Sequence, residues 1–202
     1  MNYLAHAYLS FSDNEILAGN MISDFVKGKT RYNYPAGIQE GITLHREIDR
    51  FTDDHPAVKK AKEIFRPAYR LYSGAITDVV FDHFLAIDES LFREKSLEEF
   101  TKETYEKLAM FSAHFPEKFA AMFPYMKMQN WLFNYSKKWG IEKSLGGLVR
   151  RSAYMKESET AFSLFNENYT ELSVIFKTFF PDVKNLAINF LKTSRGATFY
   201  PE

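Results

Sequence analysis

The chain has 202 residues, enough for one domain with a substantial core and too few for two domains of ordinary size. Apolar residues make up 46% and aromatic residues 17%, so we expect a packed globular protein rather than a disordered one. Lys plus Arg and Asp plus Glu each total 26, so no overall charge attracts nucleic acid or a membrane surface. The absence of cysteine excludes disulfides, thiol nucleophiles and thiolate metal sites.

The sequence shows no signal for export or for a membrane anchor. Residues 1–10 lack a basic segment, and His6 and Ser10 interrupt their apolar run, so they do not resemble a signal peptide. Nowhere do about 18 consecutive apolar residues occur that would form a transmembrane helix. We therefore expect a cytoplasmic protein that binds neither membranes nor nucleic acid.

The spacing of apolar residues predicts helices from the start of the chain. A short helix is expected over residues 2–10, and Asp13 can cap a second one. Pro35 suits the first turn of a long helix that extends to His55, and Pro56 would open the next helix. Asp13, Pro35 and Pro56 therefore predict where three helices begin.

Helical signals continue to the end of the chain. Ser73 can cap the next helix, and Ser96 opens a longer one with the spacing of a capping box. A Phe-rich helical pattern follows over about residues 158–180, and Pro181 is expected to start a terminal helix. Because we find no alternating strand pattern, repeat or low-complexity linker, we predict an all-α fold, a single domain of about seven to nine helices over residues 1–202.

One face of the long helix after Pro35 combines small and polar residues at intervals of four: Gly37, Gly41, His45, Asp49 and Asp53. A glycine inside a helix costs about 1 kcal/mol relative to alanine. Two glycines in line with polar residues therefore suggest space left above a polar site. The alternative is that the glycines allow close helix packing and that the charges are solvated. The face alone favours this alternative.

Histidines and aspartates gather in the first 83 residues. They are His6, His45, His55 and His83, with Asp24, Asp49, Asp53, Asp78 and Asp82. Two pairs, His45 with Asp49 and Asp78 with Asp82, have a spacing of four residues, which lets both members of a pair reach one point from a helix. Two helices that each offer such a pair can build a metal site in a helical bundle. Nitrogen and oxygen ligands without sulfur favour Mn, Mg, Fe or Zn, and the excess of carboxylates favours the harder ions.

Structural alternatives exist for most of these residues. A single histidine–aspartate pair on a helix is more often structural than functional. Asp78 and Asp82 are harder to explain in that way, because like charges four apart on an apolar helix repel unless a cation lies between them. His83 points about 100° away from Asp82 on an ideal helix and is also compatible with a hydrogen-bonded core residue. His6 and Asp24 by themselves resemble a core histidine and a helix-end carboxylate.

Several of these residues belong to longer motifs that occur in a fixed order. The motifs are Asn2-Tyr3-Leu4-Ala5-His6, Gly19-Asn20 with Ser23-Asp24-Phe25-Val26-Lys27-Gly28, Gly41-Ile42 with His45-Arg46 and Ile48-Asp49, Thr52-Asp53, and Asp82-His83-Phe84-Leu85. Weaker matches follow at Trp131-Leu132 with Tyr135, Gly146 with Arg150-Arg151, and Asn168-Tyr169-Thr170 to Phe180-Pro181. Together they resemble the acyl carrier protein phosphodiesterases, also called holo-acyl-carrier-protein hydrolases, over nearly the whole chain.

The resemblance implies a helical fold related to the HD-type metal-dependent phosphohydrolases. It also implies hydrolysis of the phosphodiester that joins 4'-phosphopantetheine to a carrier-protein serine, with a divalent metal, Mn(II) or Mg(II), as cofactor. One departure from the wider HD pattern matters. The adjacent His-Asp dyad is reversed here as Asp82-His83, so ligand assignments cannot be copied from HD enzymes.

Within this resemblance we assign metal binding to Asp24, His45, Asp78 and Asp82. Asp49 is a further ligand or the base that orients the attacking water. The serine alkoxide needs a proton, and His6 and His83 are the candidate acids. The two tryptophans are interpreted as core residues and Arg150-Arg151 as surface residues.

The expected partner, a carrier protein of this kind, is acidic. We predict that it docks on two basic runs that flank the site in sequence: Lys27, Lys29, Arg31, Lys59, Lys62, Arg66 and Arg70. Ordinary solvated helix faces are the alternative. We also expect Gly37 and Gly41 to keep the site open for the thin phosphopantetheine arm.

Two other functions remain open at this point. The first is a metal-dependent phosphohydrolase that acts on a small nucleotide or another phosphodiester with the same metal site. The second is a non-catalytic helical interaction module in which the buried His and Asp residues are structural.

Overall fold

The computed structural model describes residues 1–195. This part of the chain contains eleven α-helices, five short 3-10 helices and no strand, which confirms the predicted all-α class. This count exceeds the seven to nine helices expected. The shortest helices are α1 (Tyr3–Tyr8), with six residues, and α8 (Trp131–Asn134), with four. Its buried apolar side chains form one cluster that extends from Met1 to Leu191. The predicted single domain also includes residues 196–202, which lie outside the described part.

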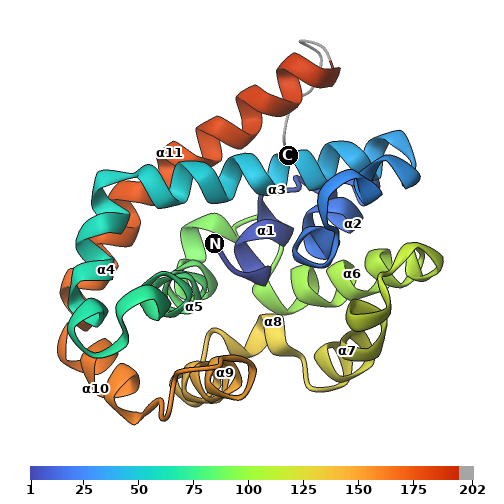
Figure 1. Cartoon of the computed structure of the whole chain (residues 1–202). Helices are drawn as coiled ribbons and strands as arrows, with labels where there is room; N and C mark the ends of the chain where they lie inside the picture. The colour runs from blue at the N-terminus through green and yellow to red at the C-terminus, as the bar shows by residue number, and fades with distance from the viewer. Residues whose placement is uncertain (196–202) are drawn as a thin grey trace.

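The short helix α1 is followed in the chain by four longer helices. Figure 1 shows α1 in the middle of the molecule, with α3 passing above it and α5 below it. The helices that follow α1 are α2 (Asn14–Ile22), α3 (Ala36–Asp54), α4 (Pro56–Tyr69) and α5 (Ser73–Ile87). The 3-10 helices η1 (Ser23–Phe25) and η2 (Gly28–Asn33) connect α2 to α3.

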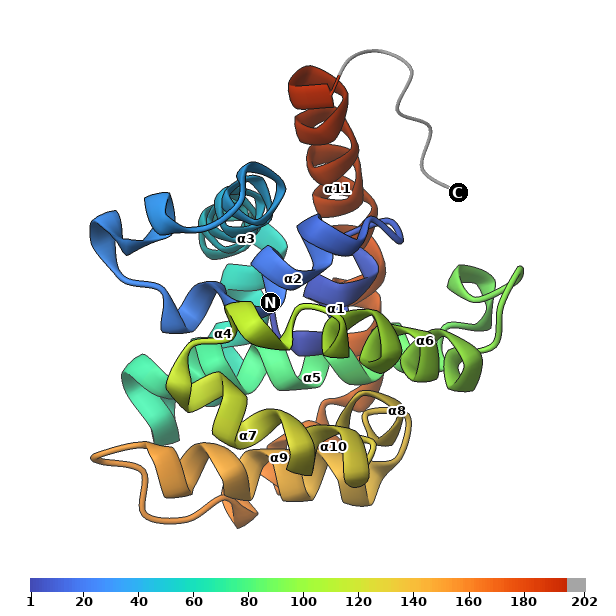
Figure 2. The ribbon, with the colours of Figure 1, turned by 90° about the vertical axis from the view of Figure 1, so that its right-hand side faces the viewer.

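The second half of the chain closes the bundle on the remaining sides (Figure 2). Its helices are α6 (Leu97–Ala109), α7 (Glu117–Met128), α8, α9 (Lys138–Arg151), α10 (Glu159–Glu167) and α11 (Tyr169–Arg195). The long helix α11 packs against α3, α4 and α5. Within residues 1–195, no helix combines the length and the apolar content needed to cross a membrane.

Helix ends follow the sequence where they depend on local hydrogen bonds. The side chain of Asp13 accepts from the backbone N–H groups of Glu15 and Ile16, at 3.1 and 3.0 Å. Ser96 and Glu99 form the predicted capping box. The side chain of His55 caps α4. These three helix starts therefore need no tertiary information.

Two predicted helix starts are wrong. Ser73 is already inside the helix, since Tyr72 holds the capping position and makes no side-chain cap. Pro181 lies inside α11 and does not begin a helix. A proline inside a helix costs about 3 kcal/mol, but α11 buries Phe179, Phe180 and Val183 around it. Each such buried side chain contributes about 1.5–3 kcal/mol, which offsets the cost of the proline.

The glycines of α3 allow close contact with α2. A Cβ atom on Gly41 would lie 2.3 Å from the carbonyl oxygen of Ile16 and 3.0 Å from the Cα of Gly19. A Cβ atom on Gly37 would lie 2.3 Å from a carboxylate oxygen of Glu15. The space above these glycines is therefore filled by α2. The expectation that they keep the site open for a substrate arm is wrong, and helix packing is the correct alternative.

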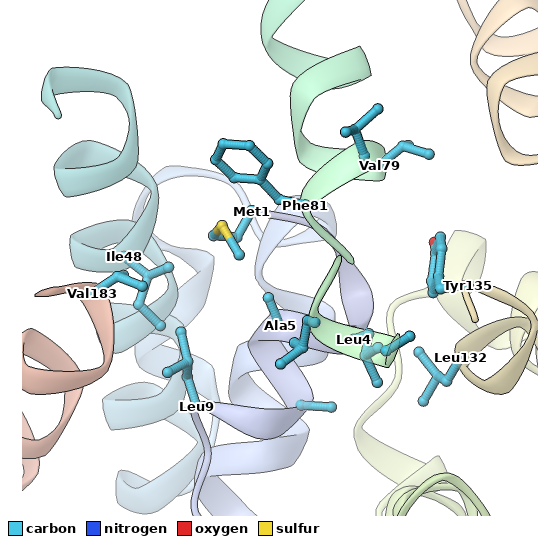
Figure 3. Close-up of a cluster of buried hydrophobic side chains, with 14 of the residues drawn as sticks. Met1, Leu4, Ala5, Leu9, Ile48, Val79, Phe81, Leu132, Tyr135 and Val183 are labelled. Atoms are coloured by element: carbon cyan, nitrogen blue, oxygen red, sulfur yellow. The ribbon is translucent and has the colours of Figure 1, made fainter. Parts of the chain in front are cut away.

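Apolar contacts hold α1 on both sides. Figure 3 shows Leu4 facing Leu132 and Tyr135, and Leu9 directed towards Ile48 and Val183. Leu4 and Leu9 are completely buried. The core thus fixes the backbone of α1 and, with it, the position of any polar side chain that α1 carries.

We expect the substitution Gly41→Ala to destabilise the protein by about 1–3 kcal/mol, because the added methyl group meets the backbone of α2. The free energy of unfolding, measured by urea denaturation, tests this. The matched control is Gly74→Ala in α5, where a Cβ atom would lie 3.5 Å from the side chain of Lys62. The control should keep or raise the stability. Equal stability of both variants would contradict the packing role of Gly41.

Candidate metal centre

Four side chains from three separate segments of the chain meet at α1. His6 comes from α1, Asp24 from η1, and His45 and Asp49 from α3. Nε2 of His45 lies 3.2 Å from Asp24 and 3.1 Å from Asp49, and Nε2 of His6 lies 3.2 Å from Asp49. The two imidazole rings stack with their centroids 3.9 Å apart. His6, His45 and Asp49 each offer a ligand atom within 4.8 Å of the others.

Asn20 on α2 orients both imidazole rings. Nδ1 of His45 lies 2.8 Å from the backbone oxygen of Asn20, which can only accept, so this nitrogen carries a proton. The side-chain amide of Asn20 donates to the backbone oxygen of His6, which leaves its own oxygen, at 2.8 Å, to accept from Nδ1 of His6. When the rings are neutral, both Nε2 lone pairs therefore face the carboxylates. Histidines that bind metals are commonly oriented in this way.

The geometry fits a divalent cation. Within residues 1–195, Nε2 of His6 is among the few buried polar atoms without a hydrogen-bond partner, although it lies 3.2 Å from Asp49. A neutral Nε2 and a carboxylate both present lone pairs, so they repel unless a cation or a proton lies between them. The two imidazole nitrogens with Asp49 and the largely exposed Asp24 form a nitrogen and oxygen donor set of the kind that Mn, Fe and Zn accept.

The two histidines of the cluster have very different pKa values. Burial and the neighbouring His45 lower the pKa of His6 to about 4. Burial also acts to lower the pKa of His45, but hydrogen bonds to Asp24 and Asp49 outweigh it and raise this pKa to about 9. The hydrogen bond from His45 lowers the pKa of Asp24. Near neutral pH, His45 is therefore the charged histidine of the cluster and His6 is the neutral one.

Asp78 joins the cluster through the amino group of Met1. That nitrogen lies 3.2 Å from an oxygen of Asp78 and 3.2 Å from an oxygen of Asp49. Burial raises the pKa of Asp78, whereas the positive charge of Met1 acts to lower it. The cation expected beside Asp78 is thus an ammonium group in this structure. Direct metal ligation by Asp78 stays a prediction.

Asp82 supports α1. Its two carboxylate oxygens accept hydrogen bonds from the backbone N–H groups of Leu4 and Ala5, at 2.8 and 3.1 Å. The side chain is completely buried, and burial raises its pKa to about 7 despite these bonds. Asp82 therefore positions the helix that carries His6. Its role as a metal ligand stays a prediction.

His83 is engaged on another side of α5. Its Nδ1 lies 2.7 Å from the backbone oxygen of Tyr135, and its Nε2 lies 2.8 Å from the hydroxyl of Tyr169. Burial lowers its pKa. These contacts agree with the hydrogen-bonded core residue that helix geometry allowed. Of the two candidate acids, the structure brings His6 into the cluster.

Two features of the site were missed at the sequence level. Asn20 appeared only as part of a motif, although a polar amide in an otherwise apolar helix was a usable signal. The second feature is a pocket of about 730 Å³ whose wall includes Trp131, Trp139, Arg150 and Arg151. Trp139 is 48% exposed, so its interpretation as a core residue is wrong. Helical periodicity does not distinguish the wall of a pocket from the core.

Comparisons with known proteins give matches over most of this chain. The family model for "Acyl carrier protein phosphodiesterase" matches residues 1–183. The acyl carrier protein phosphodiesterase of Photorhabdus laumondii is 31% identical over 190 residues, which cover 94% of this chain and 96% of the relative. That of Enterobacter sp. (strain 638) is 34% identical over 182 residues, 90% of this chain and 94% of the relative. No solved structure gives a significant match.

We expect the affinity of the cluster for Mn(II) to rise about tenfold per pH unit between about pH 6.5 and 8.5, because Nε2 of His45 must lose its proton before it binds a metal. Calorimetry at several pH values, in buffers of different ionisation enthalpy, measures the affinity and the proton released. The control His114→Asn, at an exposed histidine of η5, should keep the same dependence. An affinity that does not change with pH would contradict the protonated state of His45.

Proposed function

Because the chain belongs to the acyl carrier protein phosphodiesterase family, we propose that it hydrolyses the phosphodiester that joins 4'-phosphopantetheine to a serine of holo-acyl carrier protein. The apo carrier protein is the product. The observation that carries the proposal is the convergence of His6, His45, Asp49 and Asp24. A reaction of this kind needs a place where charge on a phosphate oxygen is stabilised, and this cluster offers one.

We propose Mn(II) or Mg(II) as the cofactor, held by His6, His45, Asp49 and Asp24. A divalent cation would supply Lewis-acid chemistry. It would neutralise charge on a phosphate oxygen and lower the pKa of a water molecule, so that hydroxide is available to attack phosphorus at neutral pH. Asn20 keeps both Nε2 atoms turned to this place. The proposal therefore moves His6 from the acid role expected from the sequence to cation binding, and Asp78 to a position beside the ligands.

Asp49 and Asp24 differ in their contacts and in their exposure to solvent. Asp49 contacts both imidazoles and the amino group of Met1, so its oxygens are held in place by three neighbours. Such a carboxylate can bind the cation or orient the attacking water. Asp24 is 65% exposed, whereas Asp49 is 39% exposed. It is therefore the ligand that an incoming phosphodiester meets first.

Exposed basic residues follow Asp24 closely in the chain and suit an acidic carrier protein. Figure 2 shows the segment after α2, the turn before α5 and the end of α9 projecting on the same side of the molecule. Lys27 and Lys29 are exposed on the first of these segments. On α4, Lys62 pairs with Asp53, and Arg66 pairs with Glu63, which reduces the positive charge that this helix offers a partner. We therefore propose residues 27–31 as the main docking segment. The cytoplasmic location stays a prediction.

We expect His45→Asn to reduce the release of phosphopantetheine from holo-acyl carrier protein by about 100-fold or more, because it removes a central nitrogen ligand. Mass spectrometry of the carrier protein, with Mn(II) present, separates the holo and apo forms. The control His114→Asn should keep full activity. Full activity of His45→Asn, or faster turnover of a nucleotide phosphodiester than of the carrier protein, would contradict the proposed function.

We expect Lys27→Glu combined with Lys29→Glu to lower the association rate with holo-acyl carrier protein about tenfold at low salt, because complementary charge increases the rate of encounter. Stopped-flow mixing measures this rate. The control combines Lys102→Glu on α6 with Lys118→Glu on α7, which changes the net charge by the same amount. An equal loss of rate in both variants would show that only the total charge matters, and would rule out this docking segment.

A further inference from the structure

The pocket is lined by chain neighbours of residues that contact the His–Asp cluster, although the four cluster residues themselves do not line it. Its wall includes Asn2 and Tyr3, which directly follow the residue whose amino group contacts Asp49 and Asp78. Val79, the neighbour of Asp78, also lines it. From there the pocket extends along α8 and α9. Its volume of about 730 Å³ lies within the range of about 300–1,000 Å³ that is typical of ligand sites.

The wall of the pocket combines aromatic rings with amides. The aromatic residues are Tyr3, Trp131, Tyr135 and Trp139, and the amides are Asn2, Gln129 and Asn134. The side chain of Asn2 donates to the hydroxyl of Tyr135 at 2.9 Å, and the indole of Trp131 donates to Gln129 at 3.0 Å. Such a wall suits a slender chain that carries both methylene and amide groups. The pantetheine arm has this composition.

Two adjacent glycines on α9 leave part of the wall without side chains. For a Cβ atom on Gly146 the nearest heavy atom would be 3.7 Å away, and on Gly147 it would be 3.6 Å away. Both nearest atoms belong to the guanidinium of Arg150. By contrast, a Cβ atom on Gly140 of the same helix would lie 1.9 Å from the backbone oxygen of Asn134. Helix packing thus requires Gly140 but does not require Gly146 or Gly147.

The glycine pair therefore lowers the stability of α9 without a packing reason. Each glycine inside a helix costs about 1 kcal/mol relative to alanine. An open pocket wall explains that cost. Arg150 and Arg151 follow the pair directly and add positive charge to the wall. Burial raises the pKa of Tyr3 to about 12, with Arg151 acting to lower it and Asp24 to raise it, so Tyr3 lies near both charges.

From these observations we propose that the pocket holds the pantetheine arm of the substrate, with the phosphodiester at the His–Asp cluster and the arm along α8 and α9. Gly146 and Gly147 are then specificity-determining positions, because they leave the space that the arm fills. This proposal rests on the proposed function for the identity of the ligand. Its geometry rests on the pocket alone.

The chain contains two tryptophans, and both line the pocket, so their fluorescence reports directly on its occupant. We expect free 4'-phosphopantetheine to change this fluorescence in a saturable way. Gly147→Leu should weaken the binding about tenfold or more, because remote parts of a ligand contribute much of its binding energy. The melting temperature should stay equal or rise, since leucine favours a helix over glycine.

The matched control is Gly74→Leu, a helical glycine outside the pocket whose nearest neighbour is the flexible side chain of Lys62. It should keep the fluorescence response of the unmodified protein. Turnover provides a second measurement with two substrates. Gly147→Leu should raise KM for holo-acyl carrier protein but keep the rate for bis(4-nitrophenyl) phosphate, a phosphodiester without the arm.

A normal fluorescence response and normal KM in Gly147→Leu would overturn the assignment of the pocket. An equal loss of activity on both phosphodiesters would also overturn it, because the substitution would then act on the cluster. If the unmodified protein released no phosphopantetheine from holo-acyl carrier protein, the proposed function would fail instead. The fluorescence titration would still decide whether the pocket binds the arm.

Discussion

The buried amide of Asn20 holds the candidate site together. Its side chain accepts from one imidazole and donates to the backbone of α1 and to the hydroxyl of Ser10, while its backbone oxygen accepts from the other imidazole. A buried amide left without partners costs about 1–3 kcal/mol for each group, so these bonds also define where α1 lies. One residue thus couples the position of α1 to the tautomers of His6 and His45.

This arrangement depends on how closely α2 approaches α3. Gly19 and Gly41 bring the two backbones together, and the next residue after Gly19 is Asn20. On α3, His45 lies one turn beyond Gly41 and therefore faces the same contact. From the other side, Asp82 holds the first turn of α1 through two backbone N–H groups. The packing of α1, α2 and α3 thus brings the charged side chains of the cluster within hydrogen-bonding distance of one another.

Glycines serve two different purposes in this protein. At positions 19, 41 and 140 an added Cβ atom would meet backbone within 2.3 Å, so these glycines permit close packing. At positions 146 and 147 an added Cβ atom would meet only side chains, and none closer than 3.6 Å. The same residue type therefore marks helix contacts in one part of the fold and a pocket wall in another. Only the distances separate the two cases.

The sequence alone determined the features that depend on neighbours within one or two turns. The all-α class, the caps at Asp13 and Ser96, and the shared face of His45 and Asp49 all follow from helical geometry. Tertiary structure decided the partners of the remaining charges. Asp82 binds backbone 78 residues away, and His83 binds a backbone oxygen 52 residues away. Periodicity carries no information on such contacts, because they depend on which helices pack together.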